Sequence, residues 1–104
     1  MDFEIVILPS VHLEMDEYIT YYDSLKVIGL GNEFNNYFLQ QLINLQRNPN
    51  FYSFYKSRFR RIRFQRFPYV ILYEVEEVTN LVIVHFVVPN NANQRMIEKK
   101  IFEQ

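Results

Sequence analysis

The chain begins with a short apolar run and then changes to helical spacing. Residues 3–8 (FEIVIL) are mostly apolar and end at Pro9, which predicts a strand. Ser10 is a candidate helix N-cap, and apolar residues then recur at steps of one, three and four positions as far as Leu25. Because residues three and four apart share one face of a helix, this stretch predicts a helix that buries one side.

A second helical stripe follows a turn that contains two glycines. Gly29 and Gly31 interrupt the first pattern, and Asn32 is the next candidate N-cap. Apolar residues between positions 34 and 45 again have helical spacing. Asn48, followed by Pro49, predicts the end of this helix, because a residue before proline avoids the helical region. The short turn predicts that the two helices form an antiparallel hairpin.

Three predicted strands follow the helices, at residues 55–64, 69–75 and 81–88. Residues 76–80 form the turn between the last two, and Pro89 ends the third. A short terminal helix is predicted over residues 91–102. The order strand-helix-helix-strand-strand-strand predicts an α+β fold, an antiparallel sheet with a helical hairpin on one face. One hundred and four residues without a linker or repeat predict a single domain, 1–104.

Both faces of the last two strands are apolar. Residues 69–73 read YVILY, and in the last strand Leu81, Ile83 and Val87 alternate with Val82, Val84 and Phe86. A helical hairpin covers only one face of a sheet. The second face therefore requires the C-terminal segment, a second copy of the chain or another protein as its cover. We accordingly expect the isolated chain to be sticky or to form a homodimer.

Composition excludes several classes of site. The chain has 49% hydrophobic residues, no cysteine and only two histidines, His12 and His85, so disulfides, thiolate chemistry and a zinc site are not expected. The N-terminus lacks a signal-peptide pattern, and the uncharged apolar run of residues 67–73 is too short to span a bilayer. These features predict a soluble, cytoplasmic protein that does not associate with membranes and carries no cofactor.

Positive charge is concentrated in one short segment. Residues 1–55 carry seven acids and two bases, residues 56–73 carry six bases and no acid, and residues 74–104 carry five acids and three bases. The formal net charge of -1 therefore conceals a strong local field. Two interpretations remain open. The segment is a solvated or acid-paired strand face, with Glu33 or Asp23 as partners, or it is a site for phosphate or for an acidic segment of a partner.

Alternation along residues 55–64 separates the arginines between the two faces of the predicted strand. Ile62 and Phe64 face the core, so Arg61 and Arg63 are expected to face outward, away from the hairpin. Arg66 lies at the end of this strand, beside Phe67 and Pro68, where the alternation breaks, and it is the strongest single functional candidate.

Two stretches together resemble the RelE/ParE superfamily of type II toxin–antitoxin toxins. Residues 21–52 resemble the helical hairpin of that family, and residues 59–77 (FRRIRFQRFPYVILYEVEE) resemble its middle strands. The resemblance covers roughly residues 12–90. Its landmarks are Tyr21 or Tyr22, Leu30-Gly31, Phe34, Asn48-Pro49, Arg66-Phe67-Pro68-Tyr69, Leu72-Tyr73 and His85.

The resemblance implies a toxin whose partner is a cognate antitoxin. RelE-like members cleave mRNA on the ribosome without a metal, and ParE-like members act on DNA gyrase. A non-toxic interaction module on the same fold is a third alternative. A toxin–antitoxin hetero-oligomer and a homodimer are both compatible with the resemblance.

The resemblance also assigns roles to residues. It implies catalytic roles for Arg66, His85, Arg60 and Arg63, with His85 as the acid–base group because imidazole titrates near neutral pH. It implies contacts to RNA or antitoxin for Lys56, Arg58, Arg61 and Arg95. RNA-cleaving members often carry an arginine two or three residues after this histidine, where Val87 and Val88 stand here, and that departure favours the gyrase-type alternative.

Two features also have purely structural interpretations. His85 lies among apolar residues of a strand, which is typical of a buried histidine satisfied by its neighbours. Residues 51–59 (FYSFYKSRF) interleave aromatic and basic side chains, a pattern that can stack nucleobases but that also suits packing in a chain with 17% aromatic residues.

Overall fold

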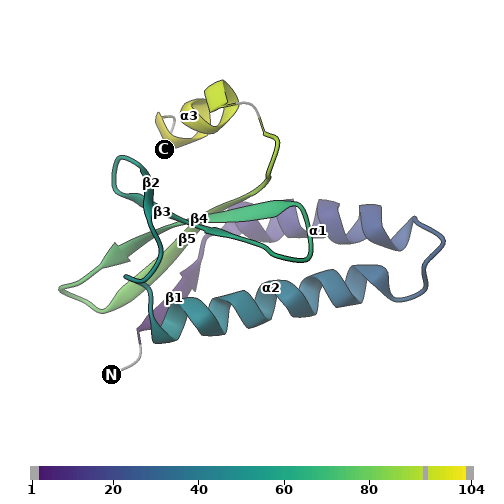
Figure 1. The fold of residues 1–104 in the computed structure, drawn as a ribbon, viewed down its shortest axis with the longest axis horizontal. Helices are drawn as coiled ribbons and strands as arrows, with labels where there is room; N and C mark the ends of the chain where they lie inside the picture. The colour runs from purple at the N-terminus through teal and green to yellow at the C-terminus, as the bar shows by residue number, and fades with distance from the viewer. Residues whose placement is uncertain (1–2, 93, 103–104) are drawn as a thin grey trace.

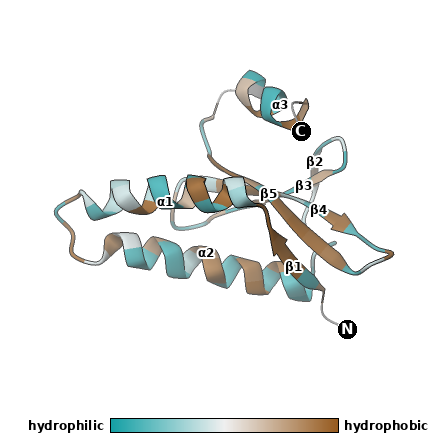
Figure 2. Cartoon of the chain, turned by 180° about the vertical axis from the view of Figure 1, so that it is seen from behind, coloured by the Kyte–Doolittle hydropathy of each residue, from teal (hydrophilic) through white to brown (hydrophobic). Residues whose placement is uncertain are grey.

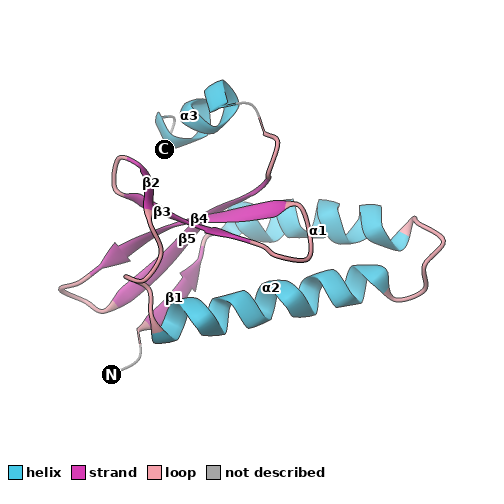
Figure 3. Cartoon of the chain, viewed as in Figure 1, coloured by secondary structure: helices cyan, strands magenta, loops and turns pink. Residues whose placement is uncertain are grey.

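The computed structural model describes residues 3–92 and 94–102, and it places a five-stranded sheet between a helical hairpin and a short C-terminal helix (Figure 1). The sheet order is β1-β5-β4-β3-β2; β1 is parallel to β5 and the other neighbours are antiparallel (Figure 3). The predicted α+β fold is confirmed. The elements are β1 Glu4–Ile7, α1 Pro9–Asp23, α2 Leu30–Arg47, β2 Phe54–Lys56, β3 Phe59–Arg63, β4 Tyr69–Glu76, β5 Leu81–Pro89 and α3 Gln94–Phe102.

Both helices of the hairpin begin earlier than their predicted caps. Helix α1 starts at Pro9, whose fixed φ suits the first helical position, so Ser10 lies inside the first turn. Helix α2 starts at Leu30, and its N-cap is Gly29, with φ 79°, in place of Asn32. Gly31 therefore lies within α2 and against α1. A Cβ on Gly31 would lie only 2.8 Å from the carbonyl oxygen of Ile19.

The predicted strand 55–64 is wrong in one respect, because it is a hairpin of two strands. Strands β2 and β3 are antiparallel, with Lys56 paired to Phe59. Ser57 makes the reversal with φ 50°. No glycine, asparagine or proline marks this turn, so the alternation of aromatic and basic residues continues through it without a visible break.

A β-bulge in β5 changes which of its residues face the hairpin. Leu72 pairs with Phe86 and Tyr73 pairs with Val84, so His85 is the extra residue of the bulge. The predicted alternation is correct before His85 and reversed after it. Val82, Val84 and Val87 face the helical hairpin, whereas Phe86 and Val88 face α3.

Two apolar cores lie on the two faces of the sheet, which contains many of the most apolar segments of the chain (Figure 2). The larger core lies between the sheet and the α1–α2 hairpin. The smaller core lies under α3, whose Ile97 and Ile101 are buried against Phe59 and the second face of β4 and β5. The C-terminal segment is therefore the cover that the apolar second face requires. The expected self-association was argued from an uncovered second face. Helix α3 of the same chain covers this face, so that argument no longer applies.

Helix α3 is tied to both sides of the molecule by ion pairs. Lys56 of β2 pairs with Glu98 on one side. On the other side, Lys100 Nζ lies 3.3 Å from Glu14 Oε2 of α1. Glu14 also accepts a hydrogen bond from the Val87 backbone N–H at 3.1 Å, and the Tyr18 hydroxyl donates to the Val87 carbonyl at 2.8 Å. Two side chains of α1 thus complete the backbone hydrogen bonds of β5 beyond the end of β1.

The Glu14 carboxyl makes a testable contribution to stability. Burial raises the pKa of Glu14 above its usual value, so the folded chain holds this proton more tightly than the unfolded chain does. This contribution to the free energy of unfolding is fully present below the ordinary pKa of 4.5, and it is lost over the interval in which pH rises from there through the raised pKa. We expect Glu14→Gln, which keeps an oxygen for the Val87 N–H, to gain stability relative to wild type over that interval in urea unfolding.

Asp16→Asn, which removes an exposed carboxylate from the same helix, is the matched control and should not show this gain over the wild type. The opposite result is that the wild type becomes more stable relative to Glu14→Gln as pH rises. The attraction between Glu14 and Lys100 would then outweigh the desolvation cost of burying the carboxylate.

Candidate functional site

The chain has one long segment that contains bases but no acid, and it runs through α2, the β2–β3 hairpin and the start of β4. From residue 34 to residue 73 the chain contains no Asp or Glu. These residues form most of α2, both strands of the β2–β3 hairpin and the start of β4. An excess of basic over acidic side chains attracts phosphate groups. The bases of this segment are Arg47, Lys56, Arg58, Arg60, Arg61, Arg63 and Arg66.

Two of the predicted catalytic arginines are engaged in local contacts. Arg66 lies between β3 and β4, where its guanidinium is 3.1 Å from Glu33 of α2. Arg60 donates hydrogen bonds to the carbonyl oxygens of Tyr52 at 2.6 Å and Asn50 at 3.3 Å. Its guanidinium also stacks over the Phe54 ring, 3.9 Å from the centroid. Arg60 therefore fixes the segment that precedes β2.

The structure does not bring Arg66, Arg60, Arg63 and His85 into one cluster. Arg60 pairs across the ladder with Tyr73, which belongs to the hairpin-side core. The His85 ring packs edge-on against Phe59, 4.9 Å between centroids, in the core under α3. Arg60 and His85 therefore lie on opposite faces of the sheet.

Arg61 and Arg63 are exposed on the α3 side of β3, as the alternation predicts. The Arg61 guanidinium lies 4.9 Å from the Tyr55 ring. Among residues 3–92 and 94–102, neither arginine forms an ion pair, and Glu33, one of the acids suggested as a partner, pairs with Arg66 instead. These two guanidinium groups are available to an anionic ligand.

A cluster that the sequence analysis missed lies on the same face. Arg58 Nε donates to Glu74 Oε2 at 2.9 Å, and His85 Nε2 lies 3.2 Å from the same oxygen. The exposed fractions of the side chains are 52% for Arg58, 22% for Glu74 and 10% for His85, so the cluster runs from the surface to the buried ring. A guanidinium, a carboxylate and an imidazole in contact can bind a phosphate and move a proton.

Glu74 carried a signal that could have revealed this cluster. It is an acid in a strand whose residues 69–73 and 75 are all apolar or aromatic, with Pro68 before them. A carboxylate in a strand buried on both faces requires a cationic or hydrogen-bonding partner. Its partners come from the turn before β3 and from the bulge of β5, and neither position follows from periodicity.

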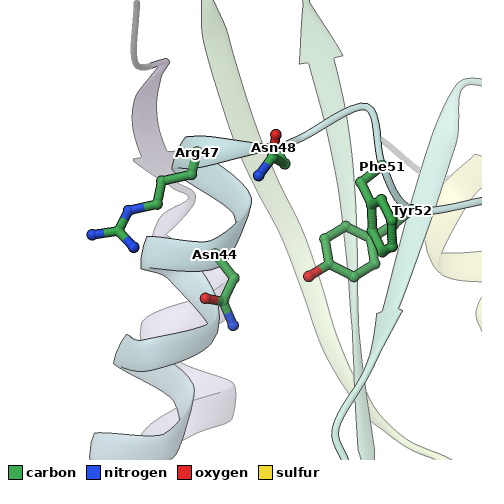
Figure 4. Close-up of a pocket in the computed structure, with 5 residues that line it drawn as sticks. All are labelled: Asn44, Arg47, Asn48, Phe51 and Tyr52. Carbon is green, nitrogen blue, oxygen red and sulfur yellow. The ribbon is translucent and has the colours of Figure 1, made fainter.

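A groove lies at the C-terminal end of α2, on a different part of the molecule (Figure 4). Asn44, Arg47 and Asn48 line one side, and Phe51 and Tyr52 line the other. Its volume is about 280 Å³.

Neither a metal-binding cluster nor a membrane-spanning helix occurs in the described parts of the chain. Within them, no three His, Cys, Asp or Glu side chains come together in a way that could hold a metal ion. None of the helices there has the length and apolar character needed to cross a membrane.

Solved structures from two bacteria share this architecture. A chain of the chromosomal ParDE toxin–antitoxin system from P. aeruginosa gives a TM-score of 0.72 at 13% identity, over 84% of this chain and 95% of that one. A double arginine-to-alanine mutant of the E. coli toxin RelE in the free state gives 0.67 at 11% identity, over 99% and 98%. The isolated E. coli RelE toxin gives 0.56 at 11% identity, over 98% and 99%. No protein-family model and no curated protein matches the sequence. The likeness confirms the fold that the sequence resemblance implied.

Proposed function

Because the chain has the fold of the RelE and ParE toxins, we propose that it is the toxin of a type II toxin–antitoxin system and halts growth by cleaving mRNA on the ribosome. The observation that carries the mechanism is the Arg58–Glu74–His85 cluster. It lies on the same face of the sheet as Arg61 and Arg63, which have no acidic partner among the described residues. The toxin acts in the cytoplasm, where its target and its antitoxin are made.

The proposed chemistry needs no metal. The RNA 2′-oxygen attacks the adjacent phosphorus and loses its proton to a base, and the 5′-oxygen leaves with a proton from an acid. Glu74 Oε2 lies between the surface and the buried ring, and it passes the proton of the 2′-hydroxyl to His85 Nε2. The same path returns a proton to the leaving 5′-oxygen. Arg58 and Arg61 stabilise the negative charge that develops on the phosphate oxygens.

The same face is the proposed contact for the antitoxin. Arg61 and Arg63 are exposed without an acidic partner in the described ranges, so they suit an acidic segment that is disordered until it binds. An antitoxin bound there would cover Arg58 and block the approach of RNA.

Inhibition without catalysis is the second candidate. It is favoured by the burial of the His85 side chain, only 10% exposed, and by the ion pair that already neutralises Arg58. On this alternative the basic face is a docking surface for gyrase or another target, and His85 is structural.

Induction of the chain alone in bacteria distinguishes these functions. We expect growth to stop and pulse-labelled protein synthesis to fall within minutes, ahead of DNA synthesis, because an mRNA-cleaving toxin removes the template for translation. Primer extension on a reporter mRNA should then show new ends that appear only during translation. Co-expression of the adjacent antitoxin gene is the control.

A fall in DNA synthesis before protein synthesis would support the gyrase-type alternative. Unchanged growth at full expression would contradict the toxin assignment and leave the interaction module.

A further inference from the structure

The groove at the end of α2 has no role in the proposed chemistry, although its walls are unusual. Phe51 is 79% exposed, which is a large apolar surface left in water beside a cavity. Figure 4 shows the Tyr52 ring extending across the groove toward Asn44, with Asn48 above and Arg47 directed away from the aromatic side. One wall is aromatic and the opposite wall presents two amides.

The aromatic wall is held in place from below. The buried Tyr73 hydroxyl donates to the Pro49 carbonyl at 2.6 Å. Burial raises the pKa of Tyr73, so this hydroxyl remains a donor across the physiological range. Arg60 binds the carbonyls of Asn50 and Tyr52. The segment that carries both rings is therefore fixed before any ligand arrives, which lowers the entropic cost of binding.

We propose that this groove binds one unstacked nucleobase of a single-stranded RNA. Phe51 and Tyr52 present ring surfaces of the kind on which bases stack, and stacking accepts every base. Side-chain amides offer a donor and an acceptor side by side, which matches the edge of a base. The volume of about 280 Å³ is at the low end for ligand pockets and suits one planar ring system.

Charge selects RNA over an acidic peptide as the occupant. The residues that line the groove belong to the acid-free part of the chain, residues 34–73, so no acid of the lining repels either polyanion. Among the described residues that line the groove, Arg47 is the only cation, and it points away from the aromatic wall (Figure 4). A carboxylate placed between the rings and the amides would lack a partner, whereas a neutral base would not. The phosphates of the flanking nucleotides would remain outside the groove, on the side of Arg47.

This proposal rests on the proposed function, because that function identifies the bound RNA as the substrate mRNA or a ribosomal strand. It assigns Arg60 a positioning role, since this side chain holds the aromatic wall. The α2 groove and the Arg58–Glu74–His85 cluster then form two separate contacts with RNA, one for binding and one for reaction.

The test is binding of a short fluorescent single-stranded RNA to the full chain, followed by anisotropy. Phe51→Ala should weaken binding about tenfold, since stacking on one aromatic side chain carries an effect of that order. Phe102→Ala is the matched control, because Phe102 is also 79% exposed but lies on α3, and it should bind as the wild type does. RNA with abasic positions should bind the wild type about as weakly as intact RNA binds Phe51→Ala.

Three results would overturn the inference: equal affinity of wild type and Phe51→Ala, equal losses in Phe51→Ala and Phe102→Ala, or undiminished binding of abasic RNA. Asn44→Ala, which leaves both rings in place, should also weaken binding and gives a second independent reading. If the chain fails to arrest growth but binds RNA through Phe51, the groove stands and the toxin proposal fails. If growth arrest occurs and Phe51→Ala binds RNA normally, the groove fails and the toxin proposal stands.

Discussion

Growth arrest should be lost when His85 is replaced by glutamine. The glutamine amide can still donate a hydrogen bond to Glu74, as the His85 Nε2 position does at 3.2 Å, but it cannot take up or release a proton near neutral pH. General acid–base catalysis contributes about 100-fold to 10,000-fold, so RNA cleavage should fall by at least about 100-fold. Colony formation under induction and primer extension on a translated reporter measure the two effects.

The second histidine of the chain provides the control. His12→Gln makes the same chemical change at an exposed position of α1, and it should arrest growth as the wild type does. Urea unfolding of both variants must show that each is folded at the growth temperature. A folded His85→Gln variant with full toxicity would contradict the acid–base role, and it would favour inhibition by binding alone.

The order of elements could be predicted from the sequence because each long element buries one continuous stripe or run. Helix α2 shows this best, since its predicted stripe includes Phe34, Phe38, Leu42 and Leu45, and all four are buried in the structure. The C-terminal helix was also predicted, although from residue 91, and residue 93 lies outside the described ranges. A hydrophobic pattern over this many residues still predicts the helix when a single position departs from it.

Features that depend on one backbone angle, on one inserted residue or on distant strand pairing could not be predicted. The β2–β3 reversal depends on a positive φ at Ser57, a residue type that seldom adopts one. The bulge at His85 inserts one residue into an unbroken apolar run, and only the ladder with β4 reveals it. The parallel pairing of β1 with β5 depends on how the chain returns after two helices, which no local pattern encodes.

The location of positive charge was predictable, whereas the partner of each charge was not. The segment 56–66 is basic by inspection, but tertiary contacts decide that Arg66 meets Glu33 and Arg60 meets backbone carbonyls. Arg58 was assigned to RNA or antitoxin contact, and the structure adds its ion pair with Glu74. Pairing decides function here, because an arginine that already binds a carbonyl or a carboxylate is less available to phosphate.

The largest loss of stability is expected from Phe34→Ala. Phe34 is fully buried, and its ring lies between α1, α2 and the start of β4, so it fastens the helical hairpin to the sheet. Removing a buried phenylalanine side chain costs about 3–5 kcal/mol. Domains of this size are stable by about 5–15 kcal/mol, so the variant should lose a large part of its free energy of unfolding. Its ring neighbours, at centroid distances of 5.0–6.2 Å, are Tyr18, Tyr22, Phe64, Phe67 and Tyr69.

Leu39→Ala separates this effect from a general weakening of α2. Leu39 lies on the same helix but is 46% exposed, so its truncation should cost no more than about 1 kcal/mol. Urea unfolding of wild type and both variants gives the two differences directly. If Phe34→Ala cost no more than Leu39→Ala, the aromatic cluster would not be what holds the hairpin to the sheet. The hairpin would then depend on the aliphatic contacts of Val11, Met15 and Leu45, and substitutions there should produce the larger loss.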